Sequence, residues 1–219
     1  SWYKNKLEKI SSSIKENSDV AVFCSSELII DDIRKSIKIW QYGPFKKPFY
    51  KRLLFKGNCI STSASIVKKS IIIEKDIFFN EQKSYVTAED YDFFLKIAFH
   101  NVKFKFINDV LGEHLYHEKS MSSNYEAHKS SVNLVIKNHI NKFSKNTFIK
   151  NLLLFRSRFS IHVGDLKFLL YKKKYLKFFL KIIFLVFTYP DRTLEFVINI
   201  IKIKRLTKRY FTNHSNLFQ

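Results

Sequence analysis

The segment 89–106 changes from helical to strand periodicity, and this change constrains the fold more than any other feature of the sequence. In its first half the apolar residues recur on one helix face, at Phe93, Phe94, Ile97 and Ala98. In its second half apolar residues alternate with lysines from Val102 to Phe106, as in a strand with one buried face. A helix, a short link and a strand in this order predict an α/β fold with helices layered on a sheet.

The rest of the chain changes character at about residue 124. Before it, the patterns predict a helix over residues 2–17, strands over residues 20–24 and 58–67, and an irregular exposed stretch over residues 31–55. After it, residues 125–160 are typical of basic helices. Four Gly and three Pro in 219 residues also favour regular elements. We therefore expect an α/β unit over residues 1–123 and a basic helical extension over residues 124–219.

The charge of the chain limits the kinds of partner it can have. Lys and Arg number 39 against 19 Asp and Glu, which gives a formal net charge of +20. Such an excess favours an anionic partner, which can be a nucleic acid, a phosphorylated small molecule or an anionic membrane. Only two Cys are present, Cys24 and Cys59, so a disulfide scaffold is not expected.

Three of these scarce acids, Glu89, Asp90 and Asp92, lie within four positions at the start of the helix predicted over 89–99. One interpretation is structural, because Thr87 can cap the helix and acids in a first turn complement its dipole. The other is chemical, because a carboxylate held at a helix start can accept a proton from a hydroxyl. Position alone does not decide between the two.

Several short motifs follow one another in a consistent order around these acids. They are Asn58 with the serines of 61–65, Lys68-Lys69, Phe79-Asn80-Glu81, Glu89-Asp90-Tyr91-Asp92, Leu111, and the His-x-x-Ser-x-Ser pattern of 117–122. In this order and spacing the segments resemble the family 2 glycosyltransferases of the GT-A fold. The resemblance covers roughly residues 1–123, the acceptor-side half of such a catalytic domain.

The resemblance implies transfer of a sugar from a nucleotide-sugar donor to a hydroxyl of a saccharide or lipid-linked acceptor, with inversion. Asp90 would be the catalytic base and Glu89 would hold the acceptor or orient a neighbour. The expected setting is the biosynthesis of a bacterial surface glycan. A divalent metal, Mg²⁺ or Mn²⁺, would neutralise the leaving diphosphate.

The resemblance also implies residues that bind the substrates. His117 would lie near the diphosphate, and its imidazole could instead ligate the metal. Ser120 and Ser122 could donate hydrogen bonds to the same group. Ser63 belongs to a polar strand face that either lines the acceptor site or faces solvent.

Trp2 and the segment 6–9 resemble the helix that follows the Asp-x-Asp metal motif of the family. We therefore expect the chain to begin just after that motif, without the nucleotide-binding half, and to be inactive alone. The alternative is a basic protein that binds a membrane or nucleic acid without catalysis. No recognised nucleic-acid motif is present, so nucleic acid is not the expected partner.

The C-terminal segment 165–219 contains 12 Lys and Arg against three acids, set among apolar stretches. Its apolar run from Tyr175 to Phe187 is too short to span a bilayer core of about 30 Å. Apolar helix faces beside cations are typical of helices that lie in a membrane interface. We expect a cytoplasmic protein that associates peripherally with the inner face of the plasma membrane, unless these helices simply pack on the catalytic domain.

Overall fold

The computed structural model describes residues 1–32, 35–43, 48–117, 124–143 and 145–213. The elements are α1 (Lys6–Glu16), β1 (Val20–Asp31), β2 (Ser36–Trp40), α2 (Phe49–Lys56), β3 (Ser65–Val67), α3 (Lys69–Glu74), the 3-10 turn η1 (Lys83–Tyr85), α4 (Glu89–Phe99), β4 (Lys103–Tyr116), α5 (Tyr125–Phe143), α6 (Thr147–Tyr171), α7 (Tyr175–Thr188) and α8 (Pro190–Asn213). The fold is therefore α/β, as the change of period predicts.

β1 is the centre of a mixed sheet, because it pairs with each of the other three described strands. β4 runs parallel to it over its whole length, from the pair Val20–Lys103 to the pair Asp31–Tyr116. β2 and β3 pair antiparallel with different parts of β1, β2 with residues 27–31 and β3 with residues 22–24. Most of β1 is buried, which suits its apolar first half.

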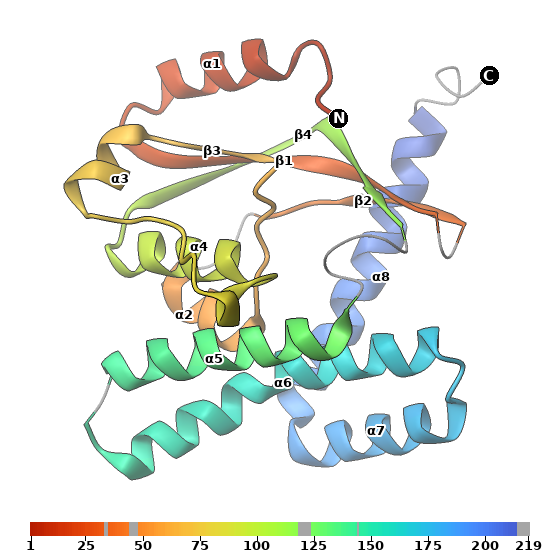
Figure 1. The fold of residues 1–219 in the computed structure, drawn as a ribbon. Coiled ribbons are helices and arrows are strands. Elements are labelled where there is room, and N and C mark those ends of the chain that lie inside the picture. Colours follow the sequence, from red (N-terminus) through yellow and green to blue (C-terminus); the bar gives the residue numbers. More distant parts are fainter. Residues whose placement is uncertain (33–34, 44–47, 118–123, 144, 214–219) are drawn as a thin grey trace.

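Helices cover both faces of this sheet (Figure 1). On one face α1 packs its Ile10 against Phe23 and Leu111. On the other face lie α2 and α4, and α5 and α6 pack beneath them (Figure 1). The main core runs through these layers, with side chains from the sheet, α2, α4, α5 and α6 in one cluster.

α8 runs alongside β2, the outer strand of the sheet (Figure 1). The backbone N–H of Ile39 in β2 donates to Oγ1 of Thr207 in α8 at 3.1 Å. Nearer the start of α8, Glu195 forms an ion pair with Lys56 of α2. Thus α8 supplies a hydrogen-bond acceptor to the outer edge of β2, which no further described strand covers.

α4 has the predicted bounds, and all four residues of its predicted apolar stripe are buried. β4 also follows the predicted alternation and extends it by ten residues beyond Phe106, to Tyr116. The predicted helices after residue 124 are present as α5 and α6. These elements were predictable because the spacing of their apolar residues matches the face that each element buries.

The strand predicted over residues 58–67 is wrong for most of its length, since only Ser65–Val67 pairs as β3. The preceding serines bond locally instead. Oγ of Ser65 donates to the carbonyl of Ser61 at 2.7 Å, and Oγ of Ser61 lies 2.9 Å from Oγ of Ser63. Hydroxyl side chains that bond to nearby backbone favour turns over ladders, so the alternation here marks a turn.

The irregular stretch predicted over residues 31–55 is also wrong, because it contains β2 and most of α2. Leu53 and Leu54 of α2 are fully buried, and β2 pairs with the second half of β1. The helix predicted over residues 2–17 begins only at Lys6, and its Leu7 faces solvent. In each case long-range packing outweighs the local pattern.

α7 covers the apolar run from Tyr175 to Phe187 and ends at Thr188, two residues before Pro190. Among the described residues, no helix combines the length and apolar character that crossing a bilayer requires.

One carboxylate joins the three helices α5, α6 and α7. Asp165 of α6 accepts from Lys129 at 2.7 Å and from the Tyr125 hydroxyl at 2.6 Å, and its other oxygen lies 3.1 Å from Lys181 of α7. His162 is also near, at 3.4 Å. Burial raises the pKa of Asp165, but these donors outweigh burial and hold the pKa well below its usual value.

Replacing Asp165 with Asn should lower the free energy of unfolding at pH 7 by about 2 kcal/mol, since charged hydrogen bonds are lost. The depressed pKa means that this contribution is complete above the unfolded pKa of about 3.9 and is lost as the pH falls below it. The difference between wild type and Asp165→Asn, measured by urea unfolding from pH 7 to pH 3, should therefore shrink toward acid. Asp109→Asn, at an exposed position, is the control. An Asp165→Asn difference that is independent of pH would contradict the assignment.

Candidate functional site

The turn before α4 has a strained backbone and is held by hydrogen bonds to α5. Thr87 has a φ of 75°, which is unfavourable for a β-branched residue. Nδ1 of His128 lies 2.9 Å from the Thr87 carbonyl oxygen, and the Ser131 hydroxyl donates to the Val86 carbonyl at 2.8 Å. The N-cap residue is Ala88, without a side-chain cap, so Thr87 does not cap the helix as the structural interpretation supposed.

Asp90 lies in the first turn of α4 and is half-buried. One carboxylate oxygen, Oδ1, accepts from the backbone N–H of Tyr91 at 2.7 Å. The other, Oδ2, faces the turn before β3, where the Asn58 amide donates to it at 3.2 Å and the Thr62 hydroxyl at 3.5 Å. The structure thus brings together two segments that the sequence analysis singled out separately.

The surroundings of Asp90 change its acidity. Burial raises the pKa of the Asp90 carboxyl, and the neighbouring charge of Glu89 raises it further. The Tyr91 N–H, the charge of His128 and the Thr62 hydroxyl lower it, and the net pKa is above its usual value. A carboxylate with a raised pKa is a better proton acceptor than an ordinary surface aspartate.

Glu89 precedes Asp90 and is also half-buried. Its Oε2 atom is buried and has no hydrogen-bond partner within the described part of the chain. A buried oxygen of this kind is costly unless something donates to it. The Glu89 and Asp90 pair therefore offers both a basic oxygen and an unsatisfied acceptor at one helix start.

A second polar cluster surrounds Glu27 of β1, which is 1% exposed. Its two oxygens accept from the Ser63 hydroxyl at 2.7 Å and from the Tyr42 hydroxyl at 2.8 Å. The Ser63 carbonyl in turn accepts from Lys6 at 2.7 Å and from the Trp2 indole at 2.8 Å. Ser63, predicted to face an acceptor or solvent, is thus exposed and at the same time fixed to the sheet.

Glu27 was missed by the sequence analysis, which ended its strand at Cys24. An acid inside an otherwise apolar strand indicates that a partner for it lies elsewhere in the fold, because a charge is buried only when it is paired. Its charge has an effect on neighbours: burial lowers the pKa of Lys6, while Glu27 opposes that shift. Burial and Glu27 together raise the pKa of the Tyr42 hydroxyl.

His117 lies elsewhere. It follows β4 directly and is exposed, and its charge lowers the pKa of Asp32, though less than Lys35 does. Tyr116 pairs with Asp31 at the last residue of β1, so His117 lies beyond the ends of β1 and β4 and not beside Glu27. Ser120 and Ser122 lie outside the described residues. The structure therefore brings Asp90, Glu89 and Ser63 into one region and leaves His117 at the carboxyl end of the sheet.

The metal expected from the resemblance has no ligand set here. In the part of the chain that the structure describes, no group of three or more His, Cys, Asp and Glu side chains could hold an ion. Glu89 and Asp90 supply two carboxylates, but Asp90 already accepts from Asn58 and Tyr91. These residues do not fit a divalent ion on their own.

Asp92, the third acid of the motif, points into the core and is 3% exposed. Its Oδ1 lies 3.0 Å from Nε2 of His139, and its Oδ2 lies 2.7 Å from Lys96. His139 continues the chain through Nδ1, which lies 3.0 Å from the Tyr50 hydroxyl. Burial raises the pKa of Asp92, but His139 and Lys96 outweigh burial and lower it. Asp92 is therefore a structural acid that fixes α4 to α5.

Comparison of this chain with family models, curated proteins and solved structures finds no match. What supports a function is thus the geometry around Glu89 and Asp90, together with the resemblance of the motifs.

Proposed function

We propose that this chain is the acceptor-side part of an inverting, nucleotide-sugar-dependent glycosyltransferase with a partial GT-A fold, acting in surface glycan biosynthesis. The observation that carries the proposal is the half-buried Asp90 carboxylate at the start of α4, with a raised pKa and with the unsatisfied Oε2 of Glu89 beside it. General bases need this combination of access and raised basicity.

In the proposed reaction Asp90 takes the proton from the acceptor hydroxyl. The hydroxyl oxygen forms a bond to the anomeric carbon, and the bond from that carbon to the diphosphate oxygen breaks. The electron pair leaves with the nucleoside diphosphate, and the configuration at carbon inverts because the attack is direct. A divalent metal, when bound by other parts of the enzyme, would neutralise the leaving group.

Each neighbour of Asp90 has a role in this scheme. Asn58 and Thr62 hold the carboxylate by their hydrogen bonds to Oδ2, so the base is oriented before the acceptor arrives. Glu89 holds the acceptor or orients a neighbouring group. His128 acts on the turn before α4 and positions the pair.

The test is a transfer assay with the full-length protein and a panel of nucleotide sugars and hydroxyl acceptors. We expect release of nucleoside diphosphate that depends on acceptor, with an inverted anomeric configuration by NMR. A full-length protein that binds none of the nucleotide sugars by calorimetry, yet binds anionic vesicles, would favour the non-catalytic alternative.

A further inference from the structure

The outer surface of α7 is apolar and uncovered among the described residues. Leu176 is 75% exposed and Phe187 is 83% exposed, at opposite ends of the helix. Between and beside them on α7 and α8 lie other large exposed apolar side chains: Phe179, Leu180, Ile183, Phe184, Leu194, Val197 and Ile198. Leu176, Phe179, Leu180, Ile183 and Phe187 recur at helical spacing and therefore share one face of α7. An exposed apolar face of this kind marks an interaction site.

The charges around this surface identify the kind of partner. Residues 147–201 contain ten Lys and Arg against three acids. Each of the three acids is already in an ion pair: Asp165 with Lys129 and Lys181, Asp191 with Arg156 and Arg192, and Glu195 with Lys56. The lysines 172–174 form the turn between α6 and α7. An apolar surface bordered by cations complements an anionic bilayer.

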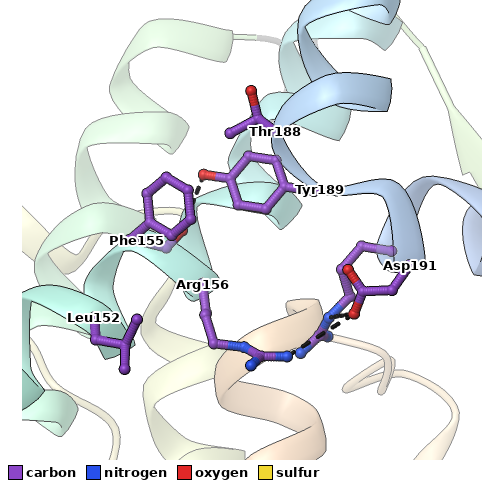
Figure 2. A pocket seen from close by; sticks show the side chains of 7 residues that line it. Leu152, Phe155, Arg156, Thr188, Tyr189 and Asp191 are labelled. Carbon is purple, nitrogen blue, oxygen red and sulfur yellow. Dashed lines mark hydrogen bonds and ion pairs between the residues drawn. The ribbon is translucent and has the colours of Figure 1, made fainter.

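A cavity of about 380 Å³ lies at the end of α7, between α6 and the corner where α7 meets α8. Figure 2 shows part of its lining, with the rings of Phe155 and Tyr189 close together and the Arg156 side chain extending toward Asp191. Tyr189 stacks on Phe155, and its hydroxyl donates to the Phe155 carbonyl at 3.0 Å. These two contacts hold the α7–α8 corner against α6.

The two arginines give this cavity an excess of positive charge. Arg156 and Arg192 both approach the same oxygen of Asp191, at 3.9 and 3.6 Å (Figure 2). Nη1 of Arg192 is buried and has no hydrogen-bond partner among the described residues. Two guanidinium groups share one carboxylate, so one positive charge remains, and guanidinium binds phosphate through paired N–H donors.

We infer that α7 and the first half of α8 dock on an anionic lipid bilayer, and that the cavity between α6 and the α7–α8 corner receives the phosphate of a lipid headgroup. The inference is independent of the proposed sugar transfer. The 14 residues of α7 span only about 21 Å, so the helix lies along the interface and does not cross the bilayer.

The test is sedimentation of the full-length protein with vesicles of phosphatidylcholine, with and without phosphatidylglycerol. We expect binding only where phosphatidylglycerol is present. The double substitution Leu176→Asp with Phe187→Asp should weaken binding at least about tenfold, because two apolar side chains no longer enter the interface. Ile73→Asp is the control, since Ile73 is 63% exposed on α3, far from α7 (Figure 1).

The cavity is tested by two further double variants. Arg156→Gln with Arg192→Gln should weaken vesicle binding about 30-fold, since it removes two cations and each cation near an anionic leaflet contributes about 1 kcal/mol. Arg156→Lys with Arg192→Lys keeps the charge but loses the paired donors, so it should bind better than the Gln pair and more weakly than wild type.

Three outcomes would overturn the inference. Wild-type affinity in the Leu176 and Phe187 variant would remove the docking surface. Full binding by the Lys pair would show that charge alone acts and that the cavity holds no phosphate. Binding of inorganic phosphate by calorimetry without sedimentation on vesicles would assign the cavity to a free ion.

Discussion

Under the proposed function, Asp90→Asn in the full-length protein should reduce sugar transfer by at least about 10²-fold, the usual range for loss of a general base. Asparagine keeps the shape of the side chain. Its carbonyl oxygen can take the place of Oδ1 and accept from the Tyr91 N–H, and its amide can donate to the Thr62 hydroxyl, so the fold and donor binding should be nearly unchanged. Transfer is measured as nucleoside diphosphate released, donor binding by calorimetry, and folding by thermal unfolding.

The matched control is Glu89→Gln, which changes the adjacent acid without removing the proposed base. We expect it to weaken acceptor binding more than it lowers the rate at saturating acceptor. The pH profile separates the roles further, because the raised pKa of Asp90 should appear as an acidic limb that Asp90→Asn abolishes and Glu89→Gln only shifts. Wild-type turnover in Asp90→Asn would show that Asp90 belongs to the helix start and is not the base.

Asp92→Ala should destabilise the fold by about 3 kcal/mol, because it leaves a buried polar ring without its hydrogen-bond partner and removes a charged hydrogen bond to Lys96. The partner here is His139, which is 3% exposed and is bonded in turn to the Tyr50 hydroxyl. The loss should appear as a lower urea midpoint with an unchanged slope.

Lys96→Met provides the control for Asp92→Ala. It removes the other partner of the same carboxylate and leaves the buried oxygen Oδ2 of Asp92 without Lys96, while the contact with His139 remains, so a smaller loss of about 1–2 kcal/mol is expected. Equal losses in Asp92→Ala and Lys96→Met would mean that the contact with His139 contributes little.

The elements that could be predicted are those whose own pattern of apolar residues shows which face is buried. α4 buries a stripe that its spacing already displays, and β4 alternates from its first residues. β2 has only five residues and depends on β1 for its hydrogen bonds, so no local pattern reveals it. The turn over 58–64 misleads because an alternating Ser and Thr pattern resembles a polar strand face, whereas hydroxyl bonding to local backbone makes it a turn.

The candidate site was predictable in part for the same reason. Asp90 is marked by its position at a helix start, but its contact with Asn58 joins residues 32 positions apart, which the sequence does not display. The cluster around Glu27 depends on Tyr42 and Ser63, each brought in by a different connection. The Arg156 and Arg192 cavity likewise exists only once α6 and α8 are packed.

The contact of α8 with the outer strand has a consequence for how the chain reaches this fold. The bond between Ile39 and Thr207 spans 168 residues, so on a ribosome β2 is complete long before its cover is synthesised. Contacts of such separation form late, because a long loop must close first. Until then the N–H groups of β2 are open to strands of other chains, which is the usual route to aggregation. Yield in expression should therefore depend on the last helix more than its small share of the core suggests.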